Sequence, residues 1–282
     1  MDSLLVTGAS GLLGRCLLDA DWDCEVVGTY YTTPIETDRE MAQLDIRDAD
    51  QVKRVFERVD PDVVIHSAAA TSVEACEDDP DLARETNALG TKHVVDAAVE
   101  AGARVVYPST AYVFGDDTPV HAEDDEPGPI NLYGESKLEG ERYVQENCPD
   151  GLIARFCVVV SLSRTRYPDF GSWVRRQLEA GERVNLISDQ RITPTVLTDA
   201  ISALQFLIEG ESQGVFHITS PDQLTRYELG REIARRHGLD PELIEGIALS
   251  EMDWSAPRPQ HLCLRAEKLR HQGYEPTKIR IE

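Results

Sequence analysis

The segment SLLVTGASGLLG (residues 3–14) decides the fold of this chain. Its first five residues form a short apolar run that predicts a buried parallel strand. The glycines Gly8, Gly11 and Gly14 follow at intervals of three, and apolar residues then recur with helical spacing. Glycines at a strand-to-helix turn let backbone N–H groups approach a pyrophosphate at the helix N-terminus. The segment therefore predicts a dinucleotide site, with a merely structural turn as the alternative.

The rest of the chain alternates between strands and helices. Strands are predicted at residues 25–30, 41–44, 61–66, 103–107, 152–160, 183–187 and 215–218. Helices are predicted at residues 81–100, 170–180 and 198–209, and another begins near Tyr133. This alternation requires right-handed crossovers and a parallel sheet covered on both faces.

We therefore predict an α/β fold, a doubly wound parallel sheet of the Rossmann type with a small C-terminal substrate-binding lobe. Residues 1–158 are expected to form the dinucleotide-binding domain, and residues 184–218 are expected to return to it. Residues 159–183 and 219–282 are expected to build the lobe over the edge of the sheet.

The composition argues against several classes of function. The 282 residues include 51 Asp and Glu against 28 Lys and Arg, and the formal net charge of −23 would repel a nucleic acid. No apolar run is long enough to cross a membrane, no signal peptide is recognised, and the six cysteines form no Cys-x-x-Cys pair. We expect a cytoplasmic, reduced protein that binds neither membranes nor metal ions. Its acidic surface is typical of proteins from salt-loving archaea.

Residues 131–137, Asn-Leu-Tyr-Gly-Glu-Ser-Lys, place a phenol and an ammonium group four residues apart. At that spacing Tyr133 and Lys137 share one face of a helix. A cation beside a phenol favours the phenolate, so we expect Lys137 to lower the pKa of Tyr133 toward neutrality. The phenol could then exchange a proton with a carbonyl or alcohol oxygen. The alternative is a surface helix in which Tyr133 packs and Lys137 is solvated.

Polar residues also stand at the C-terminal ends of predicted strands, the edge where α/β sheets bind ligands. Asp45 could contact a cofactor there or only cap the next helix. Thr110 could donate a hydrogen bond to a substrate carbonyl or tie down the following loop. The second strand ends without the carboxylate that would repel a 2′-phosphate, and Arg15 could pair with such a group or be an ordinary solvated residue.

Six motifs occur in the order shown by extended short-chain dehydrogenases/reductases. They are the glycine turn, Asp45-Ile46, His66-Ser67-Ala68-Ala69, NALGT (87–91), STAYVF (109–114) and NLYGESK (131–137). Within that superfamily the chain resembles the dTDP-4-dehydrorhamnose reductases, because of the segments 127–137, 189–195 and 257–269. The resemblance covers nearly the whole chain.

The resemblance implies a function and a set of site residues. Tyr133 would be the general acid, Lys137 would lower its pKa and hold the nicotinamide ribose, and Thr110 would donate to the substrate oxygen. Besides Tyr133 and Lys137, the implied cofactor-binding residues are Gly8, Ser10, Gly11, Leu12, Leu13, Gly14, Arg15, Asp45, Ile46, Ala68 and Ala69. The implied activity is NAD(P)H-dependent reduction of a nucleotide-activated 4-keto-6-deoxysugar, foremost dTDP-4-dehydro-L-rhamnose, with NADPH favoured over NADH.

Several alternatives stay open. Another nucleotide-sugar epimerase or epimerase/reductase would use the same fold. The regulatory β subunit of animal methionine adenosyltransferase resembles this family without being catalytic. Ala111 replaces the family's usual Asp, and the strand 155–159 also departs from the family pattern, which leaves the sugar open. Arg191 and Arg258 could bind a diphosphate or form surface ion pairs. The chain could be a monomer or a homodimer.

Overall fold

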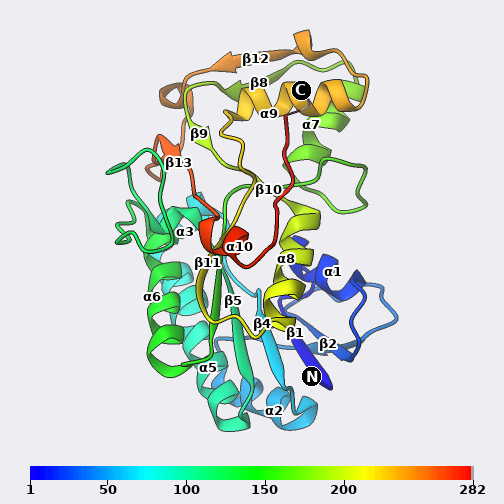
Figure 1. The fold of residues 1–282 in the computed structure, drawn as a ribbon, viewed down its shortest axis with the longest axis vertical. Helices are drawn as coiled ribbons and strands as arrows, with labels where there is room; N and C mark the ends of the chain where they lie inside the picture. The colour runs from blue at the N-terminus through cyan, green and yellow to red at the C-terminus, as the bar shows by residue number, and fades with distance from the viewer. Residues whose placement is uncertain (281–282) are drawn as a thin grey trace.

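A computed structural model describes residues 1–280 of the chain. Its centre is a sheet of seven parallel strands in the order β11-β6-β5-β4-β1-β2-β3 (Figure 1). The strands are β1 Ser3–Thr7, β2 Glu25–Tyr30, β3 Glu40–Gln43, β4 Val63–His66, β5 Arg104–Thr110, β6 Leu152–Phe156 and β11 Gly214–Ile218. The order reverses between β1 and β4, which confirms the predicted doubly wound Rossmann sheet.

Helices cover both faces of this sheet (Figure 1). One face carries α1 Leu12–Asp19 and α8 Leu197–Glu209, and the other carries α2 Ala49–Val59, α5 Gly90–Ala101 and α6 Leu132–Asn147. Alternate residues of β1 divide between the two layers: Leu4 and Val6 pack against α1 and α8, whereas Leu5 packs on the opposite side. The continuous apolar run of β1 follows from this two-sided burial.

The predicted helix 81–100 is interrupted. A short helix, α4 Pro80–Ala83, leads into a π-helical turn, η1 Arg84–Leu89, before α5 begins. Asn87 within this wide turn is fully buried, and its side-chain oxygen accepts from the Ala70 N–H at 2.8 Å. Its amide nitrogen donates to the Ser136 hydroxyl at 3.0 Å. The turn therefore ties the end of β4 to α6.

The predicted strand 152–160 is interrupted as well. β6 ends at Phe156, and β7 Val159–Val160 pairs with β10 Thr195–Val196 outside the central sheet. Val158, between the two strands, has a φ of +34°, which a residue with a branched side chain rarely adopts. The chain leaves the central sheet at this point.

The remaining elements form a lobe beyond the C-terminal edge of the sheet (Figure 1). Its strands pair in parallel, β8 Val184–Ile187 with β12 Ile244–Ile247, and β9 Arg191–Ile192 with β13 His261–Leu262. Its helices α7 Phe170–Glu179 and α9 Arg226–Arg236 pack together in one apolar cluster. The other short elements of the fold are α3 Val73–Asp78, η2 Ala111–Val113, η3 Pro241–Leu243, η4 Leu249–Glu251 and α10 Glu267–His271.

The segment 184–218 contributes strands to the lobe as well as to the central sheet. β8 pairs with β12 in the lobe, although residues 184–218 were expected to return to the Rossmann domain as a unit. Only α8 and β11 from that segment pack on or join the central sheet. The sequence of a short apolar strand such as β8 does not indicate which sheet the strand joins. We propose that the return to the Rossmann domain begins at Leu197.

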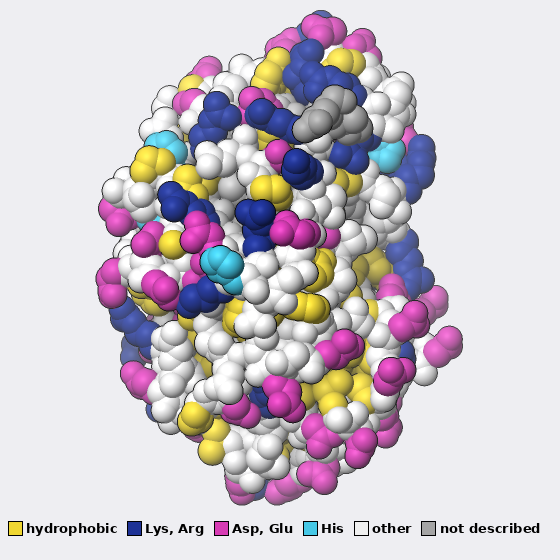
Figure 2. Space-filling model, in the orientation of Figure 1, with side chains coloured by type: hydrophobic (Ala, Val, Ile, Leu, Met, Phe, Trp, Pro, Cys, Tyr) yellow, Lys and Arg dark blue, Asp and Glu magenta, His cyan; other side chains and the backbone are white. Residues whose placement is uncertain are grey.

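Carboxylates dominate the surface of the chain. On the face drawn in Figure 2, acidic side chains surround the lower part, over the central sheet and its helices. Lys and Arg side chains gather in the upper part, over the lobe. Within residues 1–280, no helix combines the length and the hydrophobicity that crossing a bilayer requires.

Candidate active site

A cavity of about 900 Å³ opens at the C-terminal edge of the central sheet, between the sheet and the lobe. All of the predicted catalytic and cofactor-binding residues except Arg15 line it. They come from the glycine turn, from the ends of β3, β4 and β5, and from the first turns of α6. The parallel strands thus bring together residues that lie up to 129 positions apart, from Gly8 to Lys137.

The glycine turn has room for backbone atoms only. Gly8 has a φ of +65°, and a Cβ at this position would lie 2.5 Å from the Ala68 Cα. A Cβ at Gly14 would lie 2.5 Å from the carbonyl oxygen of Gly8. No side chain of residues 1–280 caps the N-terminus of α1, so its first N–H groups are free to bind an anion. This geometry fits the pyrophosphate of a dinucleotide.

Asp45 lines one end of the cavity together with an arginine that the sequence analysis did not single out. Arg47 holds the Asp45 carboxylate through its Nε at 2.9 Å and its Nη2 at 2.8 Å, and this pairing lowers the pKa of Asp45. The Arg47 Nη2 also donates to the Tyr31 hydroxyl at 2.7 Å. The cap of α2 is Asp48, which excludes the alternative that Asp45 only caps this helix.

Arg15 does not reach this end of the cavity. Its Nε donates to the carbonyl oxygen of Ser10 at 2.7 Å, and its guanidinium lies 5.6 Å from the centre of the Tyr167 ring. The sequence placed Arg15 next to the last glycine, but its side chain folds back onto the Ser10 carbonyl and does not line the cavity. Arg47 is the arginine in this region that lines the cavity.

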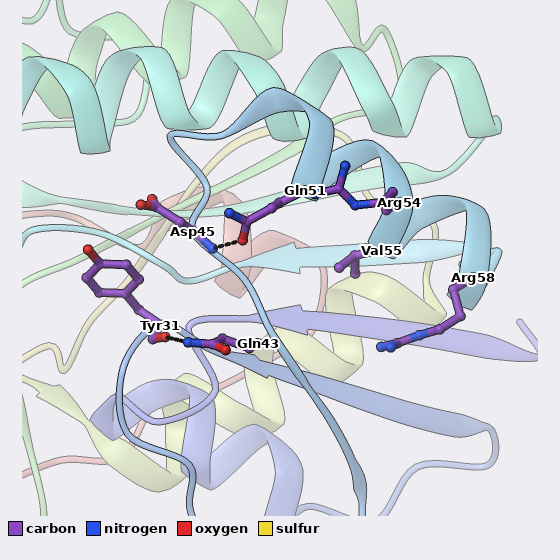
Figure 3. Close-up of a pocket in the computed structure, with 7 residues that line it drawn as sticks. All are labelled: Tyr31, Gln43, Asp45, Gln51, Arg54, Val55 and Arg58. Carbon is purple, nitrogen blue, oxygen red and sulfur yellow. Dashed lines mark hydrogen bonds between the residues drawn. The ribbon is translucent and has the colours of Figure 1, made fainter.

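A second, more open hollow of about 660 Å³ adjoins this end, along the edge strand β3 (Figure 3). It is lined by Tyr31, Gln43, Asp45, Gln51, Arg54, Val55 and Arg58. Tyr31 and Asp45 line both hollows, so the two meet there. Figure 3 shows Arg54 and Arg58 on α2, on the side away from Tyr31. The hollow contributes positive charge beyond the cavity but none of the predicted catalytic residues.

Tyr133 and Lys137 lie at the start of α6, whose N-cap Asn131 accepts the Gly134 N–H at 2.9 Å. The two residues are only 8% and 3% exposed, which excludes the surface-helix alternative. The Lys137 Nζ donates to the carbonyl oxygen of Pro108 at 2.9 Å and lies 3.9 Å from the centre of the Tyr107 ring. Its ammonium group therefore contacts β5.

Burial controls the proton affinity of both groups. Burial raises the pKa of Tyr133 to about 12, and a hydrogen bond with Thr110 acts in the opposite direction. Burial also lowers the pKa of Lys137 to about 7, while the nearby Glu141 carboxylate opposes that change. The expectation that Lys137 lowers the pKa of Tyr133 toward neutrality is wrong for this structure, because burial raises that pKa and Lys137 is not among the groups that shift it.

Thr110 ties down the loop that follows it and also lines the cavity. Its hydroxyl oxygen accepts the Tyr112 N–H at 3.2 Å, which ties down the turn η2. The hydroxyl hydrogen can donate to Tyr133, whose pKa this hydrogen bond lowers, or to a substrate oxygen. A substrate oxygen between Thr110 and Tyr133 would have two donors.

A buried ion pair packs next to Thr110 and Lys137. Arg155 on β6 and Glu141 on α6 approach to 2.7 Å, and both are at most 4% exposed. The Ser109 hydroxyl donates to the Glu141 carboxylate at 2.5 Å. These contacts join β5, β6 and α6 where Thr110 and Lys137 lie. The sequence analysis did not single out Glu141. The pattern that could have indicated this residue is its position four residues after Lys137, on the same helix face.

Of the two arginines proposed to bind a diphosphate, the structure places one in the cavity. Arg258 lines the end beneath the lobe, whereas Arg191 pairs with Glu228 at 2.9 Å on the surface. Arg226, which the sequence analysis missed, also lines the cavity and donates to the side chain of Gln190. Across residues 1–280, no cluster of His, Cys, Asp and Glu is arranged to bind a metal ion.

Residues 1–281 match the family described as the RmlD substrate binding domain. The chain belongs to this family. A relative from Haloferax volcanii, a probable low-salt glycan biosynthesis reductase called Agl14, is 33% identical over 92% of this chain and 88% of its own length. A dTDP-4-dehydrorhamnose reductase from Mycolicibacterium smegmatis is 31% identical over 98% of this chain and 81% of its own. The methionine adenosyltransferase 2 subunit beta of Danio rerio is 29% identical over 96% and 84%.

Solved structures agree with this membership in the RmlD substrate binding domain family. The dTDP-4-dehydrorhamnose reductase of Bacillus anthracis, in complex with NADP, superposes with a TM-score of 0.86 at 28% identity, covering 99% of this chain and 95% of that one. The Clostridium acetobutylicum reductase gives the same TM-score at 30% identity, covering 98% and 94%.

Two positions where the chain departs from the expected family pattern have different surroundings. Ala111 is 2% exposed and packs in the apolar cluster of the lobe, without lining the cavity. Phe156, Val158 and Val159 do line the cavity. The segment 155–159 can therefore contact a substrate directly, whereas Ala111 can act only through its neighbours.

Proposed function

We propose that the chain is an NADPH-dependent reductase of a nucleotide-activated 4-keto-6-deoxysugar, with dTDP-4-dehydro-L-rhamnose as the first candidate substrate. The observation that supports this proposal best is that Thr110, Tyr133 and Lys137 line the same cavity as the glycine turn. Membership in the family, and relatives that are reductases at 31% and 33% identity, support the same activity.

The residues of the chain divide the chemistry among them. Bound NADPH would supply the hydride to the carbonyl carbon. Tyr133, with its pKa raised to about 12, is protonated at neutral pH and can donate that proton to the oxygen that becomes an alcohol. Thr110 can donate a second hydrogen bond to the same oxygen as it gains negative charge. Lys137 shares the helix face of Tyr133, and its pKa of about 7 suits it to return a proton to the phenolate left behind.

The cofactor would lie along the cavity from the Asp45 end toward Tyr133. The glycine turn and the uncapped N-terminus of α1 fit a pyrophosphate. Arg47 and Tyr31 offer a guanidinium and a hydroxyl to a 2′-phosphate at the far end. We assign the preference for NADPH to Arg47 in place of Arg15.

The activity can be measured as consumption of NADPH with dTDP-4-dehydrorhamnose made in situ. Tyr133→Phe keeps the ring packed and removes the proton donor, so turnover should fall by roughly 10²- to 10⁴-fold with NADPH affinity unchanged. Thr110→Val should also lower turnover. Tyr143→Phe is the matched control, because that tyrosine lies on the same helix with its hydroxyl on the exposed Asp96 carboxylate at 2.5 Å.

The same experiment separates an enzyme from a regulatory subunit. A protein that binds NADPH but reduces no 4-keto nucleotide sugar would be a binding subunit, as would one whose Tyr133→Phe variant behaves like the wild type. Turnover of a UDP-sugar but not of the dTDP-sugar would keep the reductase mechanism and replace the substrate.

We further propose that the protein works in the cytoplasm of a cell with concentrated internal salt. All six cysteines are free, which supports a reducing compartment. The net charge of −23 supports adaptation to salt, because dissolved ions screen the repulsion between carboxylates.

A further inference from the structure

The end of the cavity beneath the lobe contains an ion pair with two unused polar atoms. The Arg258 Nη2 contacts the Glu74 Oε2 at 2.5 Å. The Arg258 Nη1 and the Glu74 Oε1 are buried and have no hydrogen-bond partner among residues 1–280. The Arg258 side chain is 7% exposed, and both residues line the cavity. A buried donor and a buried acceptor left unpaired are costly unless a ligand satisfies them.

Two aromatic rings fix the position of the guanidinium. The Arg258 Cζ lies 4.8 Å from the centre of the Trp254 ring and 5.4 Å from that of Tyr112. The Asn131 side chain donates to the carbonyl oxygen of Pro257 at 3.0 Å, which holds the chain next to Arg258 against the start of α6. Contacts of this kind keep the unused Nη1 in one place.

The ion pair is close to the proposed catalytic phenol. The Tyr112 ring, which Arg258 contacts, lies 5.8 Å from the Tyr133 ring in an edge-to-face arrangement. Ala256, two residues before Arg258, packs in the same apolar cluster as Tyr133. The Tyr112 ring therefore separates the ion pair from Tyr133, which would protonate the substrate. At this spacing the ion pair could contact one part of the sugar while Tyr133 contacts another.

The chemistry of the two free atoms points to a hydroxyl group. A hydroxyl can accept from the Arg258 Nη1 and donate to the Glu74 Oε1 at once. A phosphate oxygen can only accept, so it would leave the Glu74 Oε1 without a donor. Arg226 lines the cavity without an ion-pair partner among the described residues, so it suits a diphosphate better.

We propose that Glu74 and Arg258 together bind a hydroxyl group of the sugar ring, near the carbonyl that is reduced. The inference rests on the proposed function and adds the residues that select the sugar. It replaces the expectation that Arg258 binds the diphosphate. A sugar without a hydroxyl at that ring position would leave both atoms unpaired and would bind poorly.

Calorimetry with two ligands tests the inference without turnover. Wild-type protein should bind dTDP-L-rhamnose more tightly than dTDP, because only the first ligand carries the sugar. Glu74→Gln and Arg258→Gln should each weaken binding of dTDP-L-rhamnose by about 10- to 100-fold, as expected for the loss of a hydrogen bond to a charged group, and leave dTDP binding unchanged. The double variant Glu74→Gln, Arg258→Gln leaves no unpaired buried charge and should lose no more than the worse single variant.

Two control variants distinguish a contact with the sugar from a contact with the diphosphate. Arg191→Gln removes an arginine from an ion pair of the lobe outside the cavity and should change neither affinity. Arg226→Gln should weaken dTDP itself. If Glu74→Gln or Arg258→Gln weakens dTDP as much as dTDP-L-rhamnose, the pair serves the diphosphate and the inference is wrong.

Two other outcomes would also contradict the inference. If Glu74→Gln and Arg258→Gln fold and bind dTDP-L-rhamnose as the wild type does, the ion pair only stabilises the fold. Wild-type protein that binds dTDP-L-rhamnose no better than dTDP would overturn the inference directly. Absence of reductase activity alone would count against the proposed function but would leave the calorimetric comparison intact.

Discussion

Replacing Lys137 by Met should change the stability of the fold by an amount that depends on pH. The ammonium of Lys137 is buried, and its pKa falls from the ordinary 10.5 to about 7. In the unfolded chain the same group keeps its ordinary pKa, so folding opposes the charged form. Each pKa unit corresponds to about 1.4 kcal/mol. The difference between the unfolded pKa of 10.5 and the folded pKa of about 7 therefore lowers the free energy of unfolding by about 5 kcal/mol when Lys137 is charged in both states.

The sign of the effect follows from which state holds the proton. Below about pH 7, Lys137 is charged in both states and the whole cost is present. Between about pH 7 and 10.5 the folded state releases its proton first, so the cost disappears as the pH rises. Met retains the apolar stem but leaves the Pro108 carbonyl unpaired, at about 1 to 3 kcal/mol at any pH. The variant should be more stable than the wild type at pH 6 and less stable at pH 10.

Urea unfolding of both proteins at pH 6, 7, 8, 9 and 10 measures this difference, since the other titrating groups contribute equally to both. The ¹³C resonance of the lysine ε-carbon gives an independent reading, because the chain has only five lysines and the variant assigns Lys137 by its missing signal. A difference in unfolding free energy that stays constant from pH 6 to 10 would refute the reasoning. So would a Lys137 resonance that titrates near 10.5.

Three further predictions follow from other parts of the structure. The melting temperature should be higher in molar KCl than in dilute buffer, because dissolved ions screen the repulsion that the charge of −23 creates. The Debye length shrinks from about 10 Å at 0.1 M to about 3 Å at 1 M. Equal melting temperatures would count against the adaptation to salt. Arg47→Gln should weaken NADPH binding about tenfold and leave NADH binding unchanged, whereas Arg15→Gln should alter neither affinity. Fluorescence titration with both cofactors measures these affinities, and an equal loss of NADPH and NADH binding in Arg47→Gln would contradict the assignment. Gly14→Ala should abolish NADPH binding, since its Cβ would lie 2.5 Å from the Gly8 oxygen, while Gly128→Ala, which meets no atom within 4 Å, should bind as the wild type does in the same titration.

Local spacing was sufficient to predict the central sheet and most of the lining of the cavity. The run before Gly8 is typical of a strand buried on both faces, and alternation with helices then favours a parallel sheet. The C-terminal ends of parallel strands meet at one edge, so Asp45 and Thr110 fall on the same cavity as the glycine turn. These inferences need only the order of elements along the chain.

The failed expectations all depend on surroundings that the local sequence does not contain. Arg15 and Arg47 are equally plausible in the sequence, and only the direction of each side chain separates them. The pKa of Tyr133 depends on burial by residues far away in the chain, including Ala256. The π-helical turn at 84–89 preserves the apolar spacing on both sides, so its presence shows only when Asn87 finds its partners.

The ion pair between Glu74 and Arg258 joins residues 184 positions apart, and this separation orders the assembly of the site in time. The central sheet is complete once β11 has been synthesised, at Ile218. A ribosome that adds roughly 5 to 20 residues per second needs a few more seconds to reach Arg258. During that interval the nascent chain already has its glycine turn, Thr110, Tyr133 and Lys137, but not yet the segment that closes the sugar end.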